Sequence, residues 1–129
     1  MPVLQRLTVM VADQHPQRRV HLVDCLNAIG IANIRVAGDG EQAFAALMAG
    51  RCDAAFTTLQ LPRLSGPRLL KALRAQGAAP PCRVILVVAG DEAAQGTQGE
   101  AHGFDAELPW PSTPQAVKAV LEAVLGRLI

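Results

Sequence analysis

The chain has 129 residues, of which 50% are hydrophobic, and its formal net charge is +1 at pH 7. This length and apolar content predict one domain with a sizeable core, covering residues 1–129. The balanced charge excludes a strongly basic surface of the kind that binds nucleic acid or an anionic membrane. No apolar run approaches the roughly 20 residues that span a bilayer, and no signal-peptide core is present, so we expect a cytoplasmic protein.

Short apolar runs alternate with longer helical patterns along the chain. Nearly continuous apolar runs are typical of strands that are buried on both faces of a parallel sheet. Pro109 follows the last run and suits an edge strand, where a backbone amide can go unpaired. The predicted strands are residues 7–12, 34–37, 54–58, 84–89 and 104–108.

Helical spacing of apolar residues follows each strand. The first helix is predicted to begin at Pro16 and to end near Gly30, and the second opens after the turn at 38–40 and ends at Gly50. The third ends near Gly77, and the last begins near Ser112 or Thr113. The apolar residues at helical spacing are Leu22, Leu26 and Ile29, the pairs Ala43/Leu47 and Phe44/Met48, then Leu69, Leu70 and Leu73, and finally Val117, Val120, Leu121, Val124 and Leu128.

The fourth helix is the weakest pattern. It begins with Asp91 and Glu92 but contains Gly96 and Gly99. A glycine costs roughly 1 kcal/mol relative to alanine in a helix interior. We therefore expect this helix to be short, irregular or mobile, and to act as the element that changes state.

Five strand–helix units predict an α/β fold with a parallel sheet between two helical layers. Right-handed crossovers favour a flavodoxin-like (βα)5 three-layer sandwich with the strand order 2-1-3-4-5. Ligands of such sheets lie beyond the carboxyl ends of the strands. The loops after Ala12, Thr58 and Val88 should therefore lie side by side.

Four segments of the chain, at these loops and at the neighbouring strand ends, carry recognisable motifs. They read VADQHP at 11–16, GDGEQA at 38–43, LQLPRLSG at 59–66 and GFDAELPWP at 103–111. In this order and spacing they resemble the loops of the response regulator receiver (CheY-like) family, and the resemblance covers nearly the whole chain. It implies a role in two-component signalling, with a histidine kinase-like or output protein as the partner. It also implies a cis bond between Trp110 and Pro111.

Receivers of this family accept a phosphoryl group on an aspartate at the end of the third strand. Three other features of the family stabilise the charge of that phosphoryl group. They are a magnesium ion held by carboxylates after the first strand, a hydroxyl residue after the fourth strand and a lysine after the fifth. This chain departs from that pattern at each of these places. The corresponding residues are Asp13 and Gln14, Thr58, Val88 and Trp110.

These departures predict a pseudo-receiver that acts through protein contacts without aspartyl phosphorylation. A threonine hydroxyl needs a general base and a charge clamp, and with Val88 and Trp110 in place the clamp is missing. Neighbouring Thr57 points to the other face, and Asp53 lies roughly 16 Å from the strand end. We expect no enzymatic activity, no cofactor and no bound metal, with Asp13 only a weak magnesium candidate.

Several residues admit two interpretations. Asp13 is either a loop acid that caps a helix or a remnant of the phosphorylation site. The ring of Trp110 either fills the space of the missing lysine and covers Val88, or docks a partner on the face of the fourth helix, fifth strand and fifth helix. Phe104 is a second candidate partner contact, and this face is also the candidate homodimer surface.

The histidines and cysteines are not spaced along the sequence as metal ligands usually are. Histidines 15, 21 and 102 are predicted to be surface or capping residues, and the adjacent Arg18 and Arg19 to lie on a solvated face. Cys25, Cys52 and Cys82 are predicted to be small buried thiols, because their odd number and wide separation argue against a disulfide framework or a zinc site.

Two other functions compete with the pseudo-receiver. The first is a conventional phospho-accepting receiver with a relocated acceptor. The second is a flavin- or nucleotide-binding protein on the same fold. The loop at 13–16 argues against the second, since it has no glycine and presents an acid where a phosphate cradle needs backbone amides.

Overall fold

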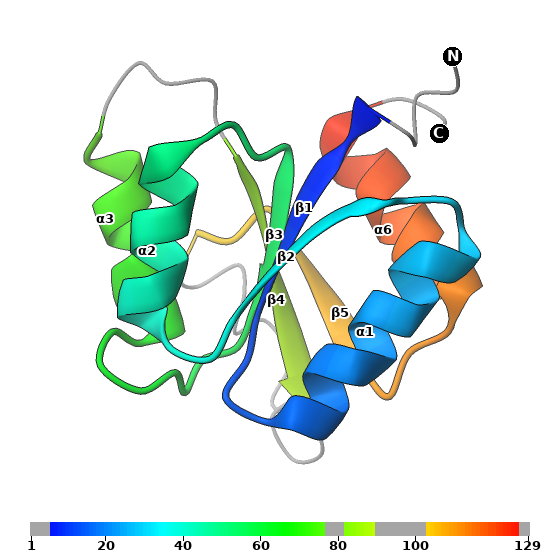
Figure 1. Cartoon of the computed structure of the whole chain (residues 1–129), viewed down its shortest axis with the longest axis horizontal. Helices are drawn as coiled ribbons and strands as arrows, with labels where there is room; N and C mark the ends of the chain where they lie inside the picture. The colour runs from blue at the N-terminus through cyan, green and yellow to red at the C-terminus, as the bar shows by residue number, and fades with distance from the viewer. Residues whose placement is uncertain (1–5, 77–81, 90–102, 127–129) are drawn as a thin grey trace.

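The structure, a computed structural model, describes residues 6–76, 82–89 and 103–126. Five parallel strands form one sheet in the order β2-β1-β3-β4-β5 (Figure 1), which confirms the predicted topology. The strands are β1 (Thr8–Ala12), β2 (Asn33–Ala37), β3 (Ala54–Thr57), β4 (Arg83–Ala89) and β5 (Ala106–Trp110). The described helices are α1 (Pro16–Ala28), α2 (Gly40–Ala49), α3 (Gly66–Arg74) and α6 (Pro114–Leu125).

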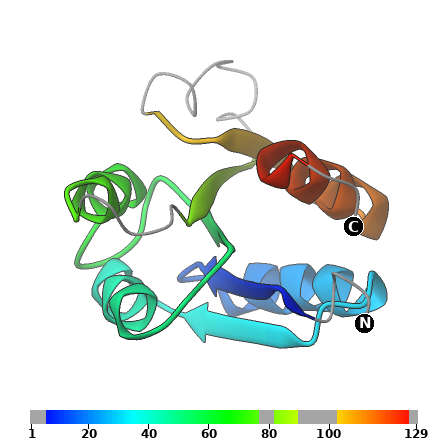
Figure 2. The same ribbon diagram turned by 90° about the horizontal axis from the view of Figure 1, so that it is seen from above.

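Two helical layers cover the sheet. Figure 2 shows α2 and α3 on one face and α1 and α6 on the other. The helix predicted to start at Asp91, with Gly96 and Gly99, lies outside the described residues, as does Leu128. None of the helices in the described ranges is long and apolar enough to cross a bilayer.

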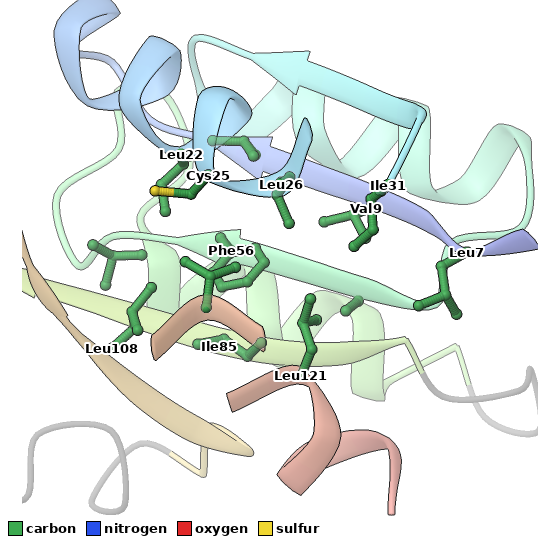
Figure 3. Packing of buried hydrophobic residues seen from close by; sticks show 14 residues of the cluster. Leu7, Val9, Leu22, Cys25, Leu26, Ile31, Phe56, Ile85, Leu108 and Leu121 are labelled. Carbon is green, nitrogen blue, oxygen red and sulfur yellow. The ribbon is translucent and has the colours of Figure 1, made fainter. Parts of the chain in front are cut away.

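The apolar runs form strands because side chains on both faces of the sheet are buried. Along β1, Val9 and Val11 pack on the α1/α6 side, while Met10 and Ala12 pack on the α2 side. This alternation is the two-residue period of a strand, and helices on both faces make every position apolar. The largest single apolar cluster among the described residues lies on the α1/α6 side (Figure 3), and Phe56 within it is fully buried.

The bounds predicted for the fifth strand were wrong. It runs from Ala106 to Trp110 instead of over 104–108, so that Pro109 lies inside it and pairs with Val88. The edge position of this strand is confirmed, and an edge strand tolerates proline because its outer amides need no partner. The observed third strand is also shorter than the predicted one, since it ends at Thr57.

Candidate functional site at the carboxyl edge of the sheet

Strand register brings the loops after β1, β3 and β4 to one edge of the sheet. Ala12 pairs with Ala37 and Val11 with Phe56, so these strands end at a similar level. Asp13 and Thr58 directly follow their strands. A hydrogen bond from the Gln14 side-chain amide to the Gln60 carbonyl oxygen, at 3.2 Å, joins the two loops. The predicted neighbourhood of the site residues is therefore present.

Asp13 is the charged residue at the centre of this edge. Its side chain is 1% exposed, and its carboxylate accepts three hydrogen bonds. The His15 backbone amide donates to Oδ1 at 2.9 Å, and the Arg18 guanidinium donates to Oδ2 at 2.8 Å and to Oδ1 at 3.0 Å. A fork of two parallel bonds is the strong form of an arginine–carboxylate pair. Asp13 is thus a neutralised, buried anion.

The prediction that Arg18 and Arg19 lie on a solvated face was wrong. The Arg18 side chain is only 19% exposed because it bends back over Asp13. Nη1 of Arg19 donates to the Asp13 backbone carbonyl oxygen at 2.7 Å. Asp13 is held at its side chain by one arginine and at its backbone by the next.

A local signal in the sequence could have identified this pair. Arg18 is the third residue of α1, which begins at Pro16. Side chains in a helix point back toward its N-terminus, so a long side chain in the first turn reaches the preceding loop. Asp13 does not cap α1, because His15 occupies the N-cap and no side chain caps the helix there.

The acceptor position is occupied by a buried hydroxyl. Thr58 is 6% exposed, and its Oγ1 donates to the Gln60 carbonyl oxygen at 3.4 Å. Val88, at the position of the family's hydroxyl residue, is buried in an apolar cluster with Leu70. The nearest acid along the third strand, Asp53, lies before the strand and accepts a hydrogen bond from the Thr8 amide at 2.9 Å. No acidic residue of the third strand therefore lies beside Thr58.

Trp110 does not cover Val88. Trp110 pairs with Ala89, so its side chain shares a face with Val87 and packs against the α1/α6 core. Val88 is on the other face, under α3. Strand alternation thus separates the two residues, and the half-buried indole fills space beside α1. The bond between Trp110 and Pro111 is cis, as the resemblance implies.

His21 is a packing residue and not a surface histidine. Its ring lies edge-on to that of Trp110, with centroids 4.6 Å apart. Nε2 of His21 is 2.6 Å from the Ser112 carbonyl oxygen, and since a carbonyl only accepts, Nε2 carries the proton. The sequence did not suggest a Cys–His pair, yet Cys25 Sγ lies 3.7 Å from that nitrogen. Burial, with the charge of Asp24, raises the pKa of the Cys25 thiol, so this is no activated nucleophile.

Phe104 is a core residue, which corrects its assignment as a partner contact. It is 7% exposed and packs with Leu70 and Val84 on the α3 side. The next residue fixes this position, because the Asp105 side chain accepts from the Val84 amide at 2.7 Å and the Asp105 amide donates to the Val84 carbonyl at 2.9 Å. Phe104 therefore precedes the ladder and turns inward.

The residues at this edge do not fit a magnesium ion. Magnesium prefers several oxygen ligands, chiefly carboxylates and water. Among the described residues, Asp13 is the carboxylate that directly follows a strand at this edge, and both of its oxygens are already bound by Arg18. In residues 6–76, 82–89 and 103–126, no group of three or more His, Cys, Asp or Glu residues is arranged to hold a metal. The Arg18 guanidinium brings a positive charge to both oxygens of Asp13.

A family model described as the response regulator receiver domain matches residues 9–122. The chain belongs to this family. The receiver domain is 27% identical to a probable chemotaxis protein CheY from Rhizobium etli, over 99% of each chain. It is 33% identical to the probable transcriptional regulatory protein NarL of Mycobacterium tuberculosis, over 98% of this chain and 58% of that protein. The chain thus spans little more than half of the latter relative.

Solved receiver structures share the fold. A putative response regulator from Chloroflexus aurantiacus superposes with a TM-score of 0.84 at 22% identity, over 94% of this chain and 98% of that one. The receiver domain of a sensor histidine kinase from Pseudomonas aeruginosa gives 0.81 at 22% identity, over 93% and 98%. The latter holds a magnesium ion in its active-site cleft. At this identity the likeness concerns the fold alone.

Proposed function

We propose that this receiver domain transmits two-component signals through protein contacts, without phosphorylation at the acceptor position. The observation that carries the proposal is the buried pair of Asp13 and Arg18, beside an acceptor position occupied by Thr58. Phosphoryl transfer in proteins depends on positioning and on stabilising charge. Here the remaining carboxylate is already neutralised, and the acceptor position has no anionic nucleophile.

The partner would be a histidine kinase-like, output or regulatory protein, or a second copy of the chain. Without a covalent switch, a partner selects between states only by binding one of them more tightly. Trp110 is half-buried against the α1/α6 core, so packing accounts for its ring and the proposal does not depend on it. A cytoplasmic location stays a prediction.

A relocated acceptor is not favoured by the geometry. Thr57 is 1% exposed and donates its hydroxyl to the Thr58 carbonyl oxygen, and Asp53 is held at the opposite edge of the sheet. A flavin- or nucleotide-phosphate site is not favoured either. The loop before α1 presents the Asp13 carboxylate, and α1 begins with Pro16, which has no amide hydrogen to donate.

The wild-type protein is expected to gain no phosphoryl group from acetyl phosphate and magnesium. The reason is that the buried Thr58 hydroxyl donates to the Gln60 carbonyl oxygen, and Arg18 is already paired with Asp13, whereas a threonine acceptor needs a general base and a charge clamp. Intact mass spectrometry after incubation measures this, with a conventional CheY-type receiver as the positive control. A gain of one phosphoryl group that is lost in Thr58→Val would contradict the proposal.

Restoring the acceptor alone is expected to be insufficient. In Thr58→Asp, a carboxylate stands at the acceptor position, but Arg18 still occupies the oxygens of Asp13 that a magnesium ion would need. We expect at most a trace of phosphorylation under conditions that modify the positive control fully. Stoichiometric phosphorylation of Thr58→Asp would show that the ion pair does not block the site.

A further inference from the structure

Two of the three cysteines meet at the amino edge of the sheet, opposite the edge that carries Asp13. Cys52 stands two residues before the start of β3, and Cys82 stands immediately before β4. The Arg83 amide donates to the Asp53 carbonyl oxygen at 3.1 Å, and Ala54 pairs with Arg83. The two cysteines therefore lie one register step apart, just before neighbouring parallel strands and outside the ladder in which side chains alternate, although 29 residues separate them in the sequence.

Their side chains lie in the same cluster on the α2 side of the sheet. Cys52 Sγ is 3.1 Å from the Ala54 carbonyl oxygen, Cys82 Sγ is 3.7 Å from the Arg83 carbonyl oxygen, and Ala54 and Arg83 are partners in the ladder. Neighbouring strands are about 4.8 Å apart with a rise of about 3.3 Å per residue, which gives a Cα–Cα distance of roughly 6 Å for such a diagonal pair. Disulfides usually join Cα atoms about 4.4–6.8 Å apart.

The two thiols differ in ionisation and in exposure. The hydrogen bond from Cys82, with the nearby Arg35 charge, lowers the pKa of Cys52 below its ordinary value. The same hydrogen bond and burial raise the pKa of Cys82. Cys52 is 9% exposed, and Cys82 is more exposed, which corrects the prediction that all three thiols are buried. An oxidant in solution can reach this pair, and Cys52 is the better nucleophile.

We propose that Cys52 and Cys82 are a modification site, at which a peroxide oxidises the two thiols to a reversible disulfide. The Cys52 thiolate attacks one peroxide oxygen, the O–O bond breaks, and the departing hydroxide is protonated to water, leaving a sulfenic acid. The Cys82 sulfur then attacks the Cys52 sulfur, loses its proton and expels the second water. Two thiols and one hydrogen peroxide give one disulfide and two waters.

The bridge ties the start of β3 to the start of β4 and encloses α3. Cross-linking a loop of this length restricts the unfolded chain and stabilises the folded one. Oxidation is expected to raise Tm by roughly 5–15 °C, and dithiothreitol should reverse the shift. This inference is independent of the proposed function, since the pair lies at the other edge of the sheet.

The test treats the full chain with hydrogen peroxide and maps it by non-reducing trypsin digestion. Cleavage after arginine separates the three cysteines, with Cys25 in peptide 20–35, Cys52 in 52–63 and Cys82 in 75–83. The expected product has lost about 2 Da, joins peptides 52–63 and 75–83, and leaves Cys25 free to be alkylated. Because wild-type protein is used, the result does not depend on a variant that folds.

The matched variants are Cys25→Ser and Cys82→Ser. Cys25→Ser should form the same linked peptides at the wild-type rate. Cys82→Ser should form none, and Cys52 should then accumulate sulfenic or sulfinic acid. The proposal is overturned if treated wild type carries only oxygen adducts on separate peptides, or if its linkage includes Cys25.

Discussion

Replacing Arg18 with methionine is expected to lower the free energy of unfolding by about 3 kcal/mol at pH 7. The methionine keeps much of the packing but leaves the Asp13 carboxylate, which is 1% exposed, without its bidentate partner. A buried charge that loses its counter-ion retains the full cost of desolvation. Denaturant unfolding followed by circular dichroism measures the loss.

Two controls isolate the charge. Arg68→Met is the matched variant, because Arg68 is also the third residue of its helix, α3, and is exposed. It should change stability by no more than about 0.5 kcal/mol. Adding Asp13→Asn to Arg18→Met should recover at least about 1 kcal/mol, since the amide removes the unpaired charge and still accepts from the His15 amide. A loss below about 1 kcal/mol in Arg18→Met would contradict the importance of the pair.

Replacing Gly40 with alanine is expected to cost roughly 2–4 kcal/mol. A Cβ at Gly40 would lie 1.8 Å from the Leu64 carbonyl oxygen, and the Gly40 amide donates to the Pro62 carbonyl oxygen at 3.0 Å. The obstacle is backbone, so no rotamer change relieves it. Helix propensity alone predicts the opposite sign, because Gly40 is the first residue of α2 and alanine favours helices.

Gly38→Ala is the matched control, two residues earlier in the same turn. Its Cβ would meet nothing closer than Arg19 Nη1 at 3.7 Å, an ordinary contact. We expect a change within about 0.5 kcal/mol, or a small stabilisation from a less flexible unfolded chain. Gly66→Ala should behave like Gly40→Ala, since its Cβ would lie 2.0 Å from the Thr58 carbonyl oxygen. Equal stability of the Gly38 and Gly40 variants in thermal unfolding would refute this account.

These two features describe how the loops at this edge of the sheet are held together. Because Gly40 and Gly66 have no side chains, the first residues of α2 and α3 pack closely against the backbone of the loop after β3. Arg18 then provides a permanent positive charge at the buried acid.

Several structural features followed from local sequence. The run from Thr8 to Ala12 is a strand because both of its faces are covered, and Pro16 begins α1 because its fixed φ suits a first helical position. Boundaries were less predictable where a tertiary contact sets them. Phenylalanine is common in strands, which is why the predicted strand included Phe104. The strand begins only at Ala106, because Asp105 is held by hydrogen bonds to Val84.

The candidate site, too, was predictable from the sequence in some respects and not in others. The positions of Asp13, Thr58 and Val88 at one edge follow from motif spacing and from the rule that parallel strands end together. The partners of these residues did not follow. Contacts such as that of His21 with the Ser112 carbonyl join segments 91 positions apart, and no local periodicity encodes them.

The sequence by itself determined the layer architecture, the strand order and the presence of a threonine at position 58, because alternating apolar periods and residue identities are local properties. Only the tertiary structure decided that Arg18 neutralises Asp13, that Phe104 and Trp110 pack inward on opposite sides of the sheet, and that Cys52 meets Cys82. The physical reason is that burial and pairing depend on which distant segments share a face, and the direction of each side chain is fixed only once the strands are in register.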